Sequence, residues 1–388
     1  MGMPFLSYGF RPFFLLAALQ AIGTLAVLAA ALLRGAWPAG APPPGRWHGH
    51  EMLFGFVAAA IAGFLLTAVP TWTNRRPVSG WPLAALAALW LAGRIAMLPW
   101  LGLLDTPLVL VDALFFPALG VALGASLVPA RNYRNWPFLG ILALLTVADL
   151  VFLAVMSGGL APPPFDPLLL VANLVTLLIA LVGGRIVPLF TRNALARGGV
   201  AIEIPQRPWL ERTVFAALIG VLLVDLVRPN GTAAGALAAA AAVLLAARLA
   251  HWHGHRTLAM PIVWVLHAGY GWLVAAFALK AAFLLGGATW AAQWLHALTA
   301  GAFGTMALGV MTRVALGHTG RPLRVAKPIA AAYVLVICGA LLRVAGPALF
   351  PAKTLSVLTA AMSVWGAAFA IFIAVYLPIL LGPRADGA

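Results

Sequence analysis

Residues 137–156 read PFLGILALLTVADLVFLAVM, and they are the clearest indication of the fold class. The only charged residue in this stretch is Asp149. A helix needs about 20 predominantly apolar residues to cross the hydrocarbon core of a bilayer, which is roughly 30 Å thick. Residues 137–156 therefore predict a membrane-spanning helix.

Similar apolar windows recur on both sides of this stretch. Together they predict an all-α, polytopic transmembrane helical bundle of about twelve spans, which forms a single integral membrane domain over residues 1–388. The first window is not a cleaved signal peptide, because its apolar core is too long and no small-residue cleavage site follows directly. The predicted spans cover residues 12–33, 50–69, 81–99, 107–129, 137–156, 167–190, 209–227, 233–250, 260–285, 291–316, 328–345 and 354–381.

The composition of the whole chain agrees with this prediction. Its 388 residues are 63% hydrophobic and 9% charged, whereas soluble domains are about half apolar and a quarter charged. This excludes a soluble protein and an intrinsically disordered one. The single cysteine, Cys338, excludes intrachain disulfides, cysteine-based zinc sites and thiolate-bound iron–sulfur clusters. A bound metal would have to be held by His, Met, carboxylate or backbone groups.

The net charge of +15 comes mostly from Arg and Lys in the short loops between the windows, where these residues set membrane orientation. Because they do not cluster on one exposed domain, we expect no nucleic-acid partner. Alternate loops hold eleven basic residues against four. By the positive-inside rule, this asymmetry predicts that both termini are cytoplasmic. The richer loops contain Arg75, Arg76, Arg131, Arg134, Arg192, Arg197, Arg207, Arg256, Arg321, Arg324 and Lys327, and the poorer loops contain Arg34, Arg46, Arg228 and Lys353.

A weak internal repeat runs through the chain. The second and sixth windows end in Val69-Pro70-Thr71 and Val187-Pro188-Leu189, and the tenth ends in Thr312-Arg313. This spacing of four windows allows a division into three four-helix units. The alternative is that cytoplasmic helix ends share such residues in general.

The first group of candidate ligands lies at the predicted outer end of the second span, where His48 and His50 are followed by Glu51. Two imidazoles two residues apart do not share one face of a continuous helix, but an unwound first turn would let both reach one ion. An imidazole-rich site without thiolate suits copper, iron or zinc. Glu51 is a candidate ligand, ligand partner or proton carrier. The alternative is that these side chains only snorkel to water.

His267 and His296 lie inside predicted spans, where a histidine is costly and tends to mark a functional site. Tyr270 lies one turn after His267 on the same face, and such a hydroxyl can bond the second nitrogen of an axial haem ligand. After His296, Gly301 and Gly304 belong to a line of small residues that predicts a flat groove. The groove could receive another helix or the face of a planar macrocycle.

Three basic residues are also predicted to lie within the membrane. Arg185 and Arg313 are in the inner parts of their spans, where few acids are available to pair with them. A haem propionate or a phosphate would satisfy them, and snorkelling to the surface is the alternative.

Lys280 lies deep in the ninth span. The loop at residues 251–255 holds three histidines, but we expect it to face solvent and assign it no metal.

The longest strings around these residues resemble the NnrS family of bacterial inner-membrane proteins. The resemblance extends from the first ten residues to about residue 330. It rests chiefly on Gly9-Phe10-Arg11-Pro12-Phe13-Phe14, Trp47-His48-Gly49-His50-Glu51-Met52-Leu53-Phe54-Gly55-Phe56, Trp264-Val265-Leu266-His267-Ala268-Gly269-Tyr270, His296-Ala297-Leu298-Thr299 and Gly309-Val310-Met311-Thr312-Arg313 with Gly317-His318-Thr319-Gly320-Arg321.

The resemblance implies a twelve-span protein of the bacterial inner membrane that contains haem b and copper and is tied to the nitric oxide response. It assigns ligand roles to His48, His50, His267, His296 and His318. The spans and the histidine of span ten are also similar to the catalytic subunit of haem-copper oxidases and nitric oxide reductases. That similarity fails at spans six and seven, which lack histidine in this chain.

The leading hypothesis is therefore a redox membrane protein that binds nitric oxide and could reduce it with electrons from an unidentified donor. In this scheme His267 and His296 hold haem, His48 and His50 hold copper, Arg185 and Arg313 hold anionic groups, and Glu51 delivers protons. One alternative is a secondary transporter with helices broken at Gly183-Gly184 and Gly301–Gly304, in which Arg185, Arg313 and Lys280 bind an anion and His267 relays protons. Another is a sensor or metal-supply protein without turnover.

Overall fold

Proline in the first turn marks where many of the helices begin. Pro44, Pro137, Pro167, Pro208 and Pro261 each open a helix. Proline suits this position because its missing N–H would have no intrahelical partner and its φ is already helical. The sequence pattern therefore locates helix starts as well as apolar spans.

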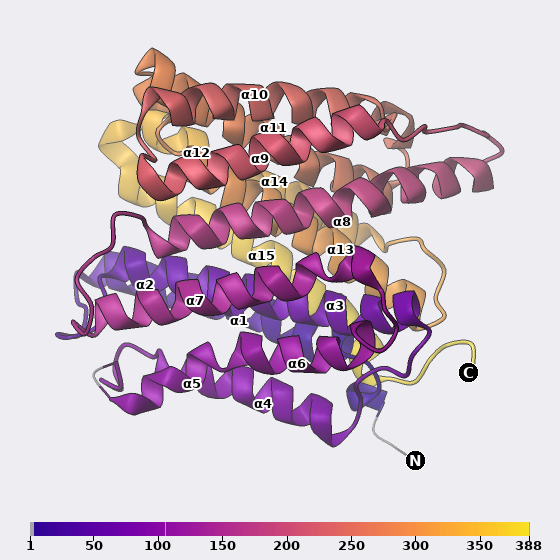
Figure 1. Cartoon of the computed structure of the whole chain (residues 1–388), viewed down its shortest axis with the longest axis horizontal. Coiled ribbons are helices and arrows are strands. Elements are labelled where there is room, and N and C mark those ends of the chain that lie inside the picture. The colour runs from indigo at the N-terminus through magenta and orange to yellow at the C-terminus, as the bar shows by residue number, and fades with distance from the viewer. Residues whose placement is uncertain (1–3, 105, 388) are drawn as a thin grey trace. The chain divides into compact units, whose positions relative to one another are not determined.

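The computed structural model describes residues 4–104 and 106–387 (Figure 1). It is all-helical, with 78% helix and no strand among these residues, so the predicted fold class is confirmed. The longer helices are α1 (Phe10–Arg34), α3 (Ala58–Thr73), α4 (Trp81–Ala96), α6 (Phe115–Leu127), α7 (Pro137–Met156), α8 (Pro167–Arg197), α9 (Pro208–Val227), α10 (Thr232–Ala250), α11 (Pro261–Gly286), α13 (Gly304–His318), α14 (Lys327–Leu349) and α15 (Thr354–Leu381).

Short helical segments connect or extend several of these helices. Two of them are π-helical: η2 (Glu51–Val57) joins α2 (Pro44–His50) to α3, and η7 (Ala297–Phe303) joins α12 (Trp294–His296) to α13. The predicted second and tenth spans are thus continuous helical segments that each widen by a π turn. The other short helix that matters here is α5 (Leu110–Ala113).

Ten helical segments of the described residues are long and apolar enough to cross a membrane. Each of the twelve predicted windows coincides with a helical segment, but two miss these criteria. Helix α4 has only 16 residues, and α9 carries Glu211, Arg212 and Asp225. The polytopic membrane protein is confirmed, while the number of twelve spans and the cytoplasmic termini stay predictions.

The first of two compact units, unit 1, comprises the described residues of 4–163, 314–322 and 372–387. In it α1 packs along α3 and η2, and α6 packs on α7. Phe13 and Phe14 of α1 are fully buried. A Cβ on Gly63 of α3 would lie 2.6 Å from the Phe14 ring. Glycine at this position therefore sets how closely α1 and α3 approach.

Unit 2 comprises residues 164–313 and 323–371. Its most extensive helix pair is α10 with α11, and α8 packs on both α9 and α11. The buried face of α10 consists mainly of small residues, among them Ala234, Ala238 and Ala241. Small side chains let helix backbones approach closely, which is the main source of packing energy between helices in lipid.

The packing forms two units and not the three four-helix units that the internal repeat allowed. Val69-Pro70-Thr71 lies close to the end of α3 at Thr73, whereas Val187-Pro188-Leu189 lies inside α8, which continues to Arg197. Threonine hydroxyls near both strings bond the preceding turn, as Thr73 and Thr191 do. The strings therefore share local bonding but not their position relative to a helix end.

Candidate metal centre

The polar core of unit 1 is built around His50, the last residue of α2. The π-helical segment η2 begins at the next residue, Glu51, and π turns within helices occur frequently at functional sites. Asp112 of α5 and Asp149 of α7 approach the imidazole from two other helices. All of these side chains are buried, and His50 has an exposed fraction of 0%.

The imidazole faces one carboxylate oxygen from each of these aspartates. His50 Nε2 lies 3.0 Å from Asp149 Oδ1 and 3.3 Å from Asp112 Oδ2. One ligand atom from each of the three residues lies within 4.8 Å of the other two. The imidazole is stacked between Phe54 and Phe152, with ring centroids 4.7 and 4.6 Å away. The two phenyl rings hold the imidazole plane in the orientation that directs Nε2 at the aspartates.

A second layer of polar groups fixes the other side of the cluster. His50 Nδ1 lies 3.2 Å from Glu51 Oε1. Arg94 of α4 donates to Glu51 Oε1 at 2.6 Å and also pairs with Asp112. Gln20 of α1 donates to Glu51 Oε2 at 2.7 Å. Glu51 is therefore held from three sides, as expected of the carboxylate partner of a metal-bound imidazole.

The charges of this cluster favour a bound cation. Glu51, Asp112 and Asp149 contribute three carboxylates, and the guanidinium of Arg94 offsets one of them. If the imidazole proton is on Nδ1 toward Glu51, the Nε2 lone pair faces two carboxylate oxygens. That arrangement requires a positive charge between them, either a second imidazole proton or a metal ion. Asp112 Oδ2 is buried and accepts no hydrogen bond, which leaves it available as a ligand.

One imidazole nitrogen and two carboxylate oxygens form a ligand set that first-row transition metals such as iron, copper or zinc accept. The residues present therefore fit a metal ion. Sequence reasoning identified His50 and Glu51 but missed Asp112, Asp149 and Arg94. A signal for the missed residues existed, since each is an isolated charge in an apolar segment, where ionisable residues are costly.

His48 is not part of this cluster. It is half-buried on α2, two residues before His50 and so about 200° around the helix axis. The first turn is helical from Pro44 onward, and the unwound turn that would bring both imidazoles to one ion does not form. The structure does not bring the predicted copper pair together.

His267 lies on α11 in unit 2 and is largely buried. Its Nε2 is 2.8 Å from the hydroxyl of Thr191, which itself donates to the carbonyl of Val187. The proton of a neutral His267 is therefore on Nε2, and the buried Nδ1 has no hydrogen-bond partner. Gly254 lies beside Nδ1 and has to be glycine there, because a Cβ at this position would lie only 2.6 Å from Nδ1.

The hydroxyl of Tyr270 serves Arg248 and not His267. Arg248 of α10 donates to this hydroxyl at 3.0 Å and to the carbonyl of Ala180 at 2.9 Å, and it pairs with Glu211. Sequence reasoning missed Arg248. Its guanidinium fits only because Gly184 lacks a side chain.

His296 is half-buried at the start of η7, near the other end of α11 from His267. Arg343 of α14 donates to His296 Nε2 at 3.0 Å and to the side chain of Gln293 at 2.7 Å. Arg343 thus occupies the lone pair that would bind a metal. Gly269 follows His267 by two residues on α11 and lies close to Met306 of α13. Met306 therefore marks the part of α13 that lies beside His267. Met306 is ten residues, or about 15 Å, beyond His296, so the two histidines are not brought together.

The predicted groove after His296 is filled by indole rings. A Cβ on Gly301 would lie 2.5 Å from the ring of Trp272, and one on Gly304 would lie 2.6 Å from the ring of Trp365. The glycines therefore accommodate neighbouring helices, which was one of the two predicted uses. Haem ligation by His267 and His296 stays a prediction.

The remaining predicted site residues are not among the residues that surround His50. His318, in unit 1, packs against Tyr8 and Phe10, with ring centroids 5.9 and 6.0 Å away. Arg185 is half-buried on α8. Lys280 is fully buried, and its Nζ lies 2.6 Å from both carboxylate oxygens of Asp225.

The sequence of the chain is similar to that of a known protein family. A family model described as NnrS protein matches residues 4–384, which is nearly the whole chain. No curated protein matches the chain.

Proposed function

The chain belongs to the NnrS family, whose membership suggests a role in the nitric oxide response, and we propose on that premise that it binds nitric oxide at a metal ion held by His50, Asp112 and Asp149. The observation that carries the proposal is the buried imidazole between two aspartate oxygens. Nitric oxide is small, neutral and soluble in lipid. It can therefore reach a buried site from the bilayer without a polar substrate pocket. The proposal places the protein in the bacterial inner membrane.

A redox-active ion such as copper or iron would supply open coordination positions for nitric oxide. The chain's own residues hold and orient the ligands. Glu51 accepts from the imidazole and fixes which nitrogen is protonated, and Arg94 ties Glu51 to Asp112. Glu51 contacts His50 directly, so its carboxylate could accept a proton from the imidazole and return it. Haem is not needed for this proposal.

Metal analysis of the detergent-purified chain tests the proposal. We expect about one copper or iron ion per chain, and an optical or paramagnetic resonance spectrum that changes on addition of nitric oxide. His50→Ala and Asp149→Asn should each lower the metal affinity by about tenfold or more, because each removes a ligand. His255→Ala is the matched control, since His255 is exposed in a loop of unit 2.

Two results would overturn this proposal. One is a metal-free wild-type protein, and the other is a His50→Ala variant with wild-type metal content. A pyridine haemochrome assay on the same sample reports separately whether haem is present. Consumption of nitric oxide with a reductant, followed by electrode, separates an oxidoreductase from a sensor or metal-supply protein.

The transporter alternative loses two of its supports in unit 2. Helix α8 continues through Gly183 and Gly184 without a break. Lys280, which was to bind an anionic substrate, is paired with Asp225. Both findings favour a fixed binding protein over a carrier with discontinuous helices.

A further inference from the structure

One buried basic side chain of unit 2 lacks the polar partners that the other buried basic side chains described above have. Arg313 lies on α13, close to the end of that helix at His318, and has an exposed fraction of only 6%. Its Nη1 atom is buried and makes no hydrogen bond to any described residue. A buried donor left without a partner costs about 1–3 kcal/mol, and more when it is charged.

The other buried basic side chains named so far all have partners. Arg94 pairs with Glu51 and Asp112, Arg248 with Glu211, and Lys280 with Asp225. Arg343, which is half-buried, bonds Gln293 and His296 in the same way. These pairings show how the fold ordinarily satisfies an intramembrane charge. Arg313 is the exception among them.

The guanidinium of Arg313 is held in a fixed orientation. Its central carbon lies 3.6 Å from the ring centroid of Phe190 on α8. Stacking on an aromatic ring engages the face of the guanidinium and leaves the in-plane N–H groups free to donate. Phe190 thus orients Arg313 without satisfying it.

A second basic residue lies near Arg313. Arg197, the last residue of α8, adds positive charge beside it, whereas Tyr333 of α14 acts in the opposite sense. The Tyr333 hydroxyl lies 2.6 Å from that of Thr312, which donates to the carbonyl of Gly309. The tyrosine proton is therefore engaged with Thr312. No carboxylate acts on Arg313 within the described part of the chain.

We propose that Arg313 binds an anionic oxygen group, either a small free oxyanion or the phosphate of an anionic phospholipid. Arginine suits this chemistry because its in-plane donors match the oxygens of phosphate and carboxylate groups. Arg197 adds charge next to the site. The residues of this site all belong to unit 2, and none of them is a ligand in the proposed metal site of unit 1.

Binding to the detergent-purified full chain tests the site in two arms. Phosphate and nitrite are titrated against the thermal unfolding midpoint, with chloride at equal ionic strength as reference. Native mass spectrometry reports whether an anionic phospholipid stays bound. We expect a saturable response in one arm, and Arg313→Gln should weaken it by about tenfold or more because charged hydrogen bonds are lost.

Arg324→Gln is the matched control, because it removes the same charge from an exposed loop residue and should bind as the wild type does. Arg313→Lys keeps the charge but loses the planar donors and should bind with intermediate affinity. The proposal is overturned if the wild type responds in neither arm, or if Arg313→Gln binds as tightly as the wild type. His50→Ala should keep the anion site, so failure of the metal proposal is distinguishable from failure of this one.

Discussion

Gly93 controls how closely α4 can approach the metal centre. A Cβ at this position would lie 2.5 Å from Asp112 Oδ1 and 3.0 Å from Asp112 Cα. Gly93→Ala should therefore displace Asp112 and destabilise the protein by about 1–3 kcal/mol, as overpacking does. It should also lower the bound metal. The control is Gly120→Ala on α6, where a Cβ meets no atom within 4 Å. Thermal unfolding and metal content measure both effects, and equal behaviour of the two variants would refute the steric argument.

Lys280 and Asp225 form a fully buried ion pair, and Asn173 donates to the same aspartate at 2.9 Å. Removal of one partner leaves an uncompensated charge, which typically costs about 3–5 kcal/mol. Lys280→Met and Asp225→Asn should each lower the unfolding midpoint strongly. The double variant should lose less than the sum of the single losses, because it leaves no lone charge. Additive losses in this double-mutant cycle would contradict direct pairing.

The two π-helical segments resemble one another as elements. Each begins directly after a histidine, η2 after His50 and η7 after His296. An arginine lies close to each of these histidines. Arg94 bonds Glu51, the residue after His50, and Arg343 bonds His296 itself. The consequence differs because unit 1 supplies aspartates to the imidazole, whereas unit 2 supplies an arginine. The same local geometry thus places one imidazole beside two aspartates and the other beside an arginine.

A single deletion tests what η2 does for the site. Removal of Val57 should convert the π turn toward an α-helical register and rotate His50 by about 100° relative to α3. We expect bound metal to fall while helix content by circular dichroism stays the same. Removal of Ala302 from η7 is the matched control and should leave the metal of unit 1 in place. Retained metal after the Val57 deletion would show that the π turn does not position His50.

Across the whole molecule, the sequence predicts elements well and their partners poorly. Apolar length and proline positions identify the helices, because both act within one segment. Which helices become neighbours depends on packing between segments, so the meeting of His50 with Asp112 and Asp149 was not predictable. Glu51 and His50 were found because they are adjacent in the chain. The glycines near His296 were ambiguous for the same reason, since only the packed structure shows the indoles that fill the groove.

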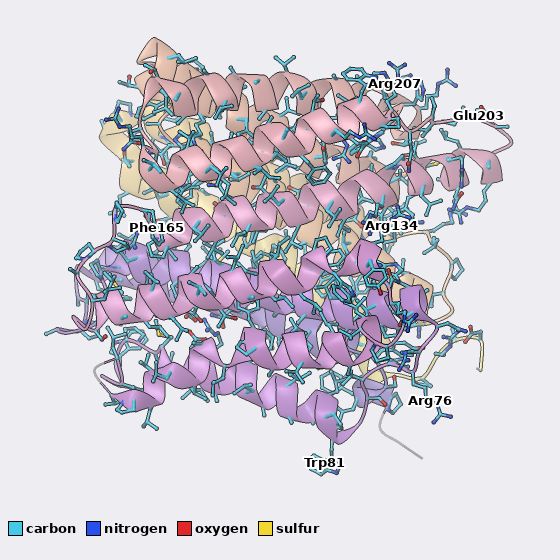
Figure 2. The ribbon with its side chains drawn as sticks, viewed as in Figure 1. Arg76, Trp81, Arg134, Phe165, Glu203 and Arg207 are labelled. Atoms are coloured by element: carbon cyan, nitrogen blue, oxygen red, sulfur yellow. The ribbon has the colours of Figure 1, made fainter. Side chains whose placement is uncertain are left out.

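Membrane orientation is the remaining property of the whole chain that the sequence predicts. The excess of basic residues in alternate loops places the α3–α4 loop in the cytoplasm and the loop after α1 outside. Figure 2 shows Arg76 and Arg134 toward the same end of the unit 1 helices, as this prediction requires. Trp81, at the start of α4, projects away from the ribbon and has an exposed fraction of 86%, which suits an aromatic anchor at the membrane interface.

Single-cysteine labelling in intact cells tests this orientation. Cys338 is the only cysteine, so Cys338→Ser provides a cysteine-free background. Ala39→Cys lies in the loop after α1 and Ser79→Cys in the α3–α4 loop, and both positions are exposed. A membrane-impermeant maleimide should label Ala39→Cys in intact cells and Ser79→Cys only after lysis. The inverse pattern would reverse the orientation. Labelling of both positions in intact cells would mean that the intervening segment, α2–η2–α3, does not cross the membrane.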